Sequence, residues 1–317
     1  MPSVRLIDLK NGLPVAFPAP CDFVLALGNF DGVHLGHQEL IKKTVEYARE
    51  NGLKAAVFSF STHPKNLLPK EKKVKSILLK EEKAKIIADL GVDYLFNIPF
   101  TKDIMSMSPE AYVQELLLDK FNMKAAFCGF NHHFGHKAQG NPDVLRSIGA
   151  ENGFSVTEMH PFKIKGDIVS SSLIRTLIAS GQVEKCKTYM GRHYAIGGEV
   201  VVGNRLGRKL GFPTSNLVID QDMVTPPNGV YITYCTYNGV QYPSVTNVGI
   251  KPTIGNYTKN VETHIFNFDK ELYGKHITVE FLKKTRDEVK FDNVRDLSEQ
   301  IVRDCREAKA FHEKKVD

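Results

Sequence analysis

The sequence has no long apolar segment. None of its uncharged apolar runs approaches the roughly 20 residues that a helix needs to span a bilayer. The five cysteines stand far apart, and no two of them form a CxxC pair, which argues against a disulfide framework and against a zinc site. We therefore expect a protein of the cytoplasm that has no membrane partner.

Two common nucleotide-binding signatures are missing as well. The glycine-rich segment GNFDGVHLGH, residues 28–37, has neither the GxxxxGK[ST] pattern of a P-loop nor the GxGxxG pattern of a dinucleotide-binding fold. A formal net charge of +6 suits phosphate-bearing partners, which include both nucleotides and nucleic acids. The chain lacks an interleaved basic and aromatic motif of the RNP1 type, so we expect no nucleic-acid partner.

The pattern of apolar residues changes once along the chain. From Asp22 to about Gly181, short apolar runs alternate with amphipathic stretches, which is typical of a parallel sheet with crossover helices. Beyond Met190 the period becomes two, and Asn238-Gly239 predicts a hairpin turn in an antiparallel sheet. A chain of 317 residues exceeds the usual size of a single core. We predict two domains, 1–186 and 187–317, and a closing helix that carries Cys305 on its apolar face.

The first candidate site follows a predicted buried strand, FVLAL. His34 and His37 are three residues apart at the start of a predicted helix that ends at Asn51, so they share one face and flank the free N–H groups. Such a helix start binds phosphate, and protonated imidazoles would add positive charge. For a single histidine, a capping or surface role remains the alternative. The remaining nucleotide-binding candidates in this segment are Gly28, Asn29, Phe30, Asp31, Gly32 and Gly36.

A second group of candidates lies at the far end of this half. Ser170, Ser171 and Ser172 lie at the start of a predicted helix, where their hydroxyls can cap free N–H groups. Arg175, one turn into that helix, can reach the β- and γ-phosphates of ATP with its planar guanidinium. An ordinary serine cap with a surface arginine is the alternative. The basic segment Lys65–Lys85 is expected to be a solvated loop and helix face, with a basic flap near a triphosphate as the alternative.

The C-terminal candidates lie in GEVVVGNRLGRKLGFPTSNL. Gly203, Gly207 and Gly211 recur every four residues, and the β-branched run before them favours a loop over a helix. Such a loop can fold over phosphates. Thr214 supplies a hydroxyl that could bind Mg²⁺, and Asn216 could support the metal or a substrate hydroxyl. A simple proline turn is the alternative for these residues.

Several segments together resemble a known family. GNFDGVHLGH and SSSLIR are similar to the HxGH nucleotidyltransferases, and SPEAYVQELL and GFNHHFGHKAQGN narrow the resemblance to the bacterial bifunctional riboflavin kinase and FMN adenylyltransferase family. The resemblance implies that Asn131 helps to hold substrate and that His63 lies near the nucleotide. Thr62 and His132 depart from the family pattern, in a proline position and an aromatic position.

The later segments resemble the riboflavin kinase half of that family. PTSN is similar to its PTAN motif, and VETHIF places Glu262 at the position of the catalytic glutamate, which orients or deprotonates the ribityl hydroxyl. Judged without the resemblance, Glu262 would be a solvent-facing strand carboxylate.

The resemblance also implies the overall fold and function. It predicts a Rossmann-like α/β nucleotidyltransferase domain, then an antiparallel β-barrel capped by the last helix. The barrel would phosphorylate riboflavin to FMN with ATP, and the first domain would adenylylate FMN to FAD, both with Mg²⁺. The partners would be riboflavin, FMN, FAD and ATP. A single-activity enzyme whose other half merely binds flavin is the alternative.

Overall fold

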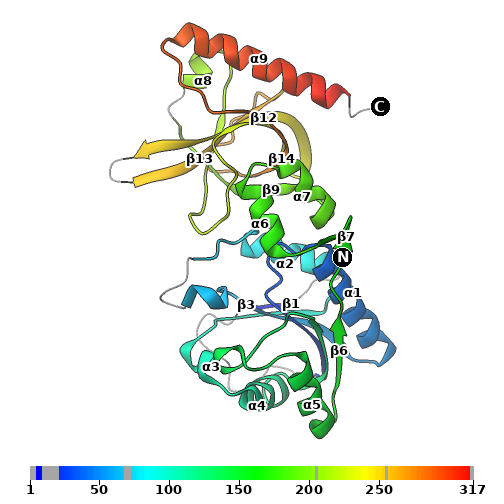
Figure 1. The fold of residues 1–317 in the computed structure, drawn as a ribbon. Helices are drawn as coiled ribbons and strands as arrows, with labels where there is room; N and C mark the ends of the chain where they lie inside the picture. Colours follow the sequence, from blue (N-terminus) through cyan, green and yellow to red (C-terminus); the bar gives the residue numbers. More distant parts are fainter. Residues whose placement is uncertain (1–4, 9–20, 68–72, 204–205, 254–255, 315–317) are drawn as a thin grey trace. The chain divides into compact units, whose positions relative to one another are not determined.

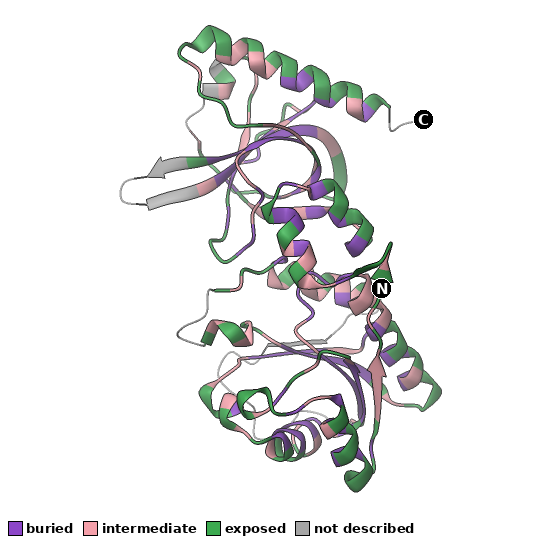
Figure 2. Ribbon diagram, viewed as in Figure 1, coloured by how far each residue is buried: buried purple, intermediate pink, exposed green. Residues whose placement is uncertain are grey.

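The computed structural model describes residues 5–8, 21–67, 73–203, 206–253 and 256–314 (Figure 1). The chain divides into two compact units. The first unit comprises Met1–Val74 and Lys80–Ser170, and the second comprises Lys75–Leu79 and Ser171–Asp317. In each unit the buried residues concentrate in the strands and on the helix faces that pack against them (Figure 2).

The first unit contains a six-stranded parallel sheet in the order β1-β4-β3-β2-β5-β6. Its central strand β2 is buried along its whole length, as expected for a strand covered on both faces. Strand order reverses beside β2, and ligands of open α/β sheets bind outside the carboxyl ends of the strands at such a point. The predicted parallel sheet is confirmed. The strands are β1 Arg5–Asp8, β2 Phe23–Leu27, β3 Lys54–Phe60, β4 Tyr94–Ile98, β5 Met123–Gly129 and β6 Ser155–Met159.

Side-chain caps mark the starts of several helices of this unit. Helix α1, Leu35–Glu50, is capped by His34 and ends at Asn51. Ser108 and Asn141 accept backbone N–H bonds at the starts of α4 (Pro109–Ala111) and α5 (Pro142–Asn152). The other elements are η1 Pro64–Leu67, α2 Lys80–Asp89, α3 Lys102–Ser106, η2 Tyr112–Leu118, η3 His136–Ala138, β7 Lys163–Ile164 and β8 Asp167–Ile168.

The second unit is built on a closed antiparallel barrel in the order β10-β13-β12-β11-β14-β9. Asn238 and Gly239 connect β11 to β12 with φ angles of 48° and 77°, the left-handed conformation of a type I′ hairpin turn. The predicted hairpin and the predicted barrel are both confirmed. The strands are β9 Tyr194–Val201, β10 Ser215–Val218, β11 Gly229–Tyr237, β12 Val240–Thr253, β13 Asn256–Ile265 and β14 His276–Asp287.

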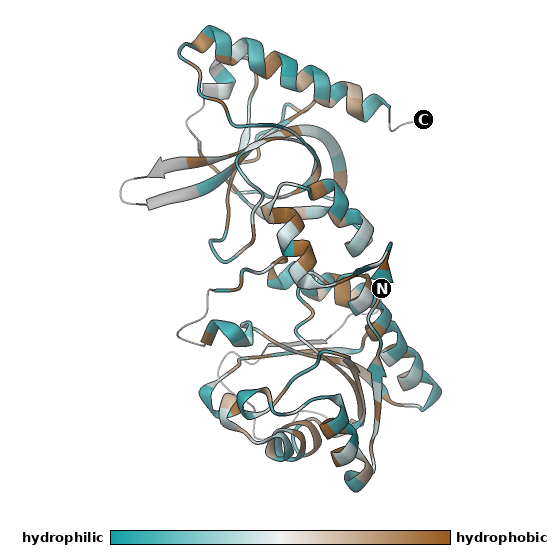
Figure 3. Cartoon of the chain, viewed as in Figure 1, coloured by the Kyte–Doolittle hydropathy of each residue, from teal (hydrophilic) through white to brown (hydrophobic). Residues whose placement is uncertain are grey.

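Helices cover parts of this barrel. Helix α9, Val294–Glu313, packs on β11 and β12 and buries Cys305 and Ala308. Its remaining surface is largely hydrophilic, with hydrophobic residues interspersed along it (Figure 3). Helix α7, Val183–Met190, packs on β14 and β9 and contacts α6, Ser171–Ala179. These contacts group α6 and α7 with the barrel, and the functional boundary between residues 186 and 187 stays a prediction.

Candidate active sites

The loop that leaves β2 has an unusual backbone. Phe30 and Val33 adopt φ angles of 50° and 36°, a region that non-glycine and especially β-branched residues avoid. Both side chains are buried, and the N–H of Val33 donates to the carbonyl of Phe30 at 3.2 Å. Backbone of this kind costs energy and persists where the surrounding packing over-determines it, most often at functional sites. The burial of both side chains holds this loop in its tight turn.

His34 and His37 lie together at the start of α1. The N–H of His37 donates to Nδ1 of His34 at 3.2 Å, so His34 caps the helix with an imidazole nitrogen. Because this Nδ1 accepts, a neutral His34 carries its proton on Nε2. The two rings stack with centroids 3.5 Å apart and an interplanar angle of 18°. The predicted shared face is confirmed, and the stacking disfavours a state in which both rings are cationic.

Lys83, on α2, also belongs to this site, and the sequence pattern did not single it out. Its ammonium donates to the carbonyl of Asn29 at 2.8 Å and to the hydroxyl of Ser59 at 2.6 Å. Burial lowers the pKa of Lys83 to about 8, while the charge of Asp31 acts in the opposite direction. The expectation of a solvated basic face over Lys65–Lys85 is therefore wrong for Lys83, because α2 turns this residue toward the loop. Residues 68–72 of that segment lie outside the described residues.

Other predicted residues follow neighbouring strands at the same edge of the sheet. Asn131 lies two residues beyond β5 and is exposed. His63 lies beyond β3, and its Nδ1 accepts from the N–H of Lys65 at 3.3 Å. Because all six strands are parallel, the carboxyl ends that precede Asn131, His63 and His34 share one edge.

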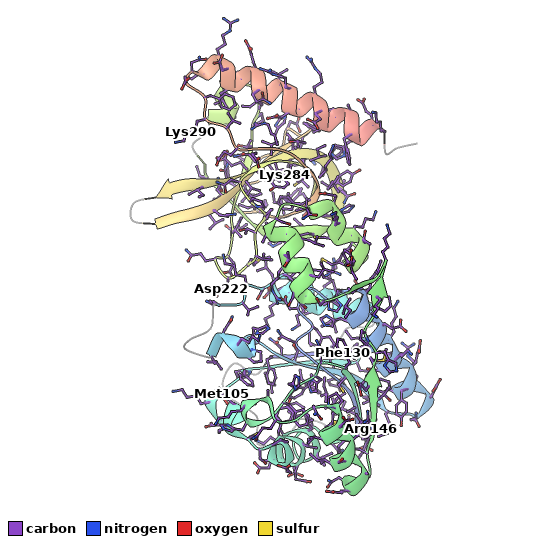
Figure 4. All side chains as sticks on the ribbon, viewed as in Figure 1. Met105, Phe130, Arg146, Asp222, Lys284 and Lys290 are labelled. Carbon is purple, nitrogen blue, oxygen red and sulfur yellow. The ribbon has the colours of Figure 1, made fainter. Side chains whose placement is uncertain are left out.

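Two exposed aromatic residues add an apolar border to this edge. Phe130, which directly follows β5 (Figure 4), is 40% exposed, and Phe162 is 37% exposed. A Cβ placed on Gly36 would lie 3.1 Å from the Cβ of Phe162. Glycine at this position therefore lets the segment after β6 pack closely against the start of α1. No local sequence pattern indicates this contact, because it joins residues far apart in the chain.

His132, a departure from the family pattern, occupies its position as an aromatic ring. It stacks on Phe134 with centroids 5.6 Å apart and an interplanar angle of 24°. Burial is the main cause that lowers the pKa of His132 to about 4, so the ring is neutral near pH 7. Its Nε2 is shielded from solvent and has no hydrogen-bond partner within the described part of the chain. The packing is thus that of an aromatic residue.

Arg175 and two of the three serines belong to the second unit. Helix α6 begins at Ser171, one residue after Ser170, which closes the first unit. The predicted helix start is therefore confirmed. The Nε of Arg175 donates to the carbonyl of Lys75 at 2.7 Å. The role of Arg175 at the phosphates of ATP stays a prediction from the sequence.

The barrel brings the C-terminal candidates together on β10 and β13. Asn216 lies directly opposite Glu262 in the strand register. The NH₂ group of Asn260 donates to Oδ1 of Asn216 at 3.0 Å and to Oε1 of Glu262 at 2.8 Å. A Cβ on Gly203 would lie 2.5 Å from the Asn216 amide, so only glycine lets the loop lie against this side chain. Glu262 therefore belongs to a polar cluster, and sequence reasoning missed Asn260.

The glycine-rich segment before β10 corrects one expectation. It contains a four-residue helix, α8 Leu206–Lys209, where the sequence favoured a loop. The carbonyl of Gly207 accepts from the N–H groups of Leu210 and Phe212, which closes a tight turn after the helix. Gly211 has a φ of 85°, a conformation that favours glycine.

An open pocket of about 390 Å³ adjoins this segment. Phe212 lies edge-on to the ring of His264 at 5.7 Å, and Nδ1 of His264 lies 2.8 Å from the carbonyl of Pro213. Because a carbonyl can only accept, Nδ1 carries the proton; burial lowers the pKa of this histidine. The apolar stripe of α9 predicted only packing, so the sequence missed this pocket. Its lining residues are Phe212, Val302, Cys305, Arg306, Lys309, Ala310 and Glu313.

A histidine pair at the switch point of a parallel sheet, joined in one chain to a barrel with a glycine-rich turn before β10, defines a two-part transferase that uses nucleotides. The FAD synthetase family model matches residues 17–173, and the riboflavin kinase model matches residues 190–312. The chain belongs to the family of bifunctional riboflavin kinase/FMN adenylyltransferases. Among the described residues, no helix is both long and apolar enough to cross a membrane.

Individual relatives match over nearly the whole chain. The bifunctional riboflavin kinase/FMN adenylyltransferase of Bacillus subtilis is 35% identical over 90% of this chain and 91% of its own length. That of Escherichia coli K12 is 32% identical over 91% of this chain and 92% of its own length. A crystal structure described as a macrolide-efflux protein from Streptococcus pneumoniae has a TM-score of 0.85 and 29% identity, and covers 96% of this chain and 98% of its own.

Proposed function

We propose that this chain makes FAD from riboflavin in two ATP-dependent steps. The barrel site transfers the γ-phosphoryl group of ATP to riboflavin, and the sheet site transfers AMP from a second ATP to FMN and releases pyrophosphate. The observation that carries the proposal is that one chain holds both the stacked His34 and His37 at a helix start and Asn216 opposite Glu262 in the barrel. The bifunctional relatives support the same conclusion.

At the sheet site, the terminal phosphate oxygen of FMN attacks the α-phosphorus of ATP, so no nucleophilic side chain is needed. His34 and His37 donate to the phosphate oxygens as negative charge builds up, and the free N–H groups of α1 add to this effect. Arg175 binds the β- and γ-phosphates, and Asn131 and His63 hold substrate and nucleotide. Gly28, Asn29, Phe30, Asp31, Gly32, Gly36, Ser170, Ser171 and Ser172 complete the nucleotide site.

At the barrel site, Glu262 orients or deprotonates the terminal ribityl hydroxyl, which attacks the γ-phosphorus. The segment with Gly203, Gly207 and Gly211 covers the phosphates. The open pocket beside Phe212 is our candidate site for the isoalloxazine ring, because its walls are aromatic and aliphatic. Its charged side chains are Arg306, Lys309 and Glu313.

The barrel residues fit Mg²⁺. Thr214 and Asn216 offer oxygen atoms, which are the ligands that Mg²⁺ prefers. Within the described residues, no three His, Cys, Asp or Glu side chains are placed to hold a metal ion, which suits an ion bound largely through nucleotide phosphates. Bound there, Mg²⁺ would neutralise phosphate charge. We assign the adenylyltransferase to residues 1–186 and the kinase to residues 187–317. Five free thiols support a cytoplasmic location.

Product analysis tests the proposed function. Purified protein is incubated with riboflavin, ATP and Mg²⁺, and the flavins are separated by chromatography. We expect FAD, with FMN as the intermediate. FMN alone would indicate the single-activity alternative, in which the first unit merely binds flavin. Unchanged riboflavin, together with no FAD from supplied FMN, would refute both assignments.

A further inference from the structure

Asn260 bridges two residues of the barrel site with one NH₂ group. Asn260 is buried, and its Nδ2 lies 3.0 Å from Oδ1 of Asn216 and 2.8 Å from Oε1 of Glu262. A carboxylate only accepts hydrogen bonds, so the amide nitrogen of Asn260 must face Glu262. The second hydrogen of the same group then requires an acceptor at Asn216. The orientation of both amides thus follows from the charge of Glu262.

Strand register shows what Asn260 prevents. Asn216 and Glu262 are direct cross-strand partners, so their Cβ atoms are about 5 Å apart. If Asn260 did not donate, the NH₂ of Asn216 would provide a charge-assisted bond to this carboxylate. The Asn216 amide would then be reversed, with its nitrogen bonded to the Glu262 carboxylate and its oxygen turned elsewhere. An amide that rotates in this way keeps its shape, so packing against Gly203 does not prevent the reversal.

We propose that Asn260 is a positioning residue for riboflavin phosphorylation. It holds the amide oxygen of Asn216 with one hydrogen bond and a carboxylate oxygen of Glu262 with another, and so fixes the orientation of both groups. This inference rests on the proposed kinase function of the barrel. It adds a residue that contacts neither substrate nor reacting atoms and that acts through Asn216 and Glu262.

Kinetics of two variants and a matched control test the inference. Asn260→Ala should lower kcat for riboflavin phosphorylation about 10-fold, the lower limit for loss of a residue that orients a site ligand, with little change in the KM for riboflavin. Asn260→Asp should lower kcat about 100-fold, because it nearly preserves shape but replaces the donor by a like charge. Gln241→Ala removes an exposed amide-to-carboxylate bond on the same barrel and should have no effect. Adenylylation of supplied FMN reports folding in each variant.

A measurement without turnover follows the amide itself. In protein labelled with ¹⁵N-asparagine, the side-chain amide signals of Asn216 are assigned by their loss in Asn216→Asp. In Asn260→Ala, these protons should become protected from exchange, because they now bond to Glu262. Normal kinetics in both Asn260 variants, with exchange at Asn216 unchanged, would refute the inference. Two further results separate the two levels. Full kinase activity in Glu262→Gln would remove the catalytic role of Glu262, whereas a folded wild-type protein that does not phosphorylate riboflavin would refute the proposed function of the barrel.

Discussion

The ammonium of Lys83 lies 2.8 Å from the carbonyl oxygen of Asn29, so a charged helix residue ties down the loop that precedes α1. We expect Lys83→Met to slow FMN adenylylation on the order of 10²-fold, because small displacements of positioned phosphates are costly. The wild-type rate should also decline as the pH rises through about 8, where Lys83 loses its proton, and this decline should be absent in the variant. Riboflavin phosphorylation by Lys83→Met should be unaffected. The control Lys85→Met, which changes an exposed residue, should keep the normal rate of FMN adenylylation. A folded Lys83→Met protein with normal adenylylation would contradict this role.

The histidine pair allows capping and catalysis to be separated. His34→Ala loses both the imidazole and the helix cap, so it should lose about 1 kcal/mol of stability as well as FAD formation. His34→Asn keeps an acceptor that can cap the helix, so it should have wild-type stability but should still fail to form FAD. His37→Ala should reduce FAD formation about 10²- to 10³-fold with little loss of stability, while FMN accumulates. Equal loss of both half-reactions in a folded His37→Ala protein would show that the two units do not divide the chemistry.

His132 should make the first unit sensitive to acid. The pKa of His132 in the folded protein, about 4, lies below the ordinary value of 6.5. Between these two values the unfolded chain binds the proton and the folded chain does not, so stability is complete above pH 6.5 and falls as the pH drops toward 4. Between pH 7.5 and pH 5, the free energy of unfolding should therefore fall by about 2 kcal/mol less in His132→Phe than in the wild-type protein. Thermal unfolding at both pH values measures the difference, and parallel losses in the two proteins would argue against a neutral buried ring.

The contacts of α7 predict which C-terminal fragment folds best. Val183 and Cys186 are buried with α7 on the barrel, and a fragment that starts at residue 187 lacks both. A fragment that starts at Ser171 should be more stable by about 3 kcal/mol, the value of burying two such side chains. Both fragments should convert riboflavin to FMN when folded. Denaturant titration compares them, and equal midpoints would indicate that residues 171–186 do not stabilise the barrel.

Local signals made part of this molecule predictable from its sequence. The start of α1 at His34 and the hairpin at Asn238-Gly239 depend on residues close together in the chain, and both are confirmed. The burial of Lys83 depends on tertiary packing, because the same residue would be solvated on an isolated helix. The role of Asn260 depends on strand register, where a slip of one residue would turn its side chain to the opposite face. Neither relation leaves a pattern within a short window of sequence.

The last prediction concerns Glu262→Gln, which preserves the shape of the side chain. The glutamine oxygen can still accept from Asn260, so the cluster on β10 and β13 should remain folded. The variant can no longer accept a proton or orient a hydroxyl by charge. Riboflavin phosphorylation should fall about 10²-fold, the lower part of the range for general bases, because in a loose phosphoryl-transfer transition state the base acts late.

The affinity of Glu262→Gln for riboflavin should change much less than its turnover, and adenylylation of supplied FMN should stay near the wild-type rate, because His34 and His37 belong to the first unit. Both half-reactions are measured on one preparation. Near-normal phosphorylation would make Glu262 a structural partner of Asn260 with no part in catalysis. Equal loss of both activities would indicate misfolding, since no single carboxylate serves both reactions.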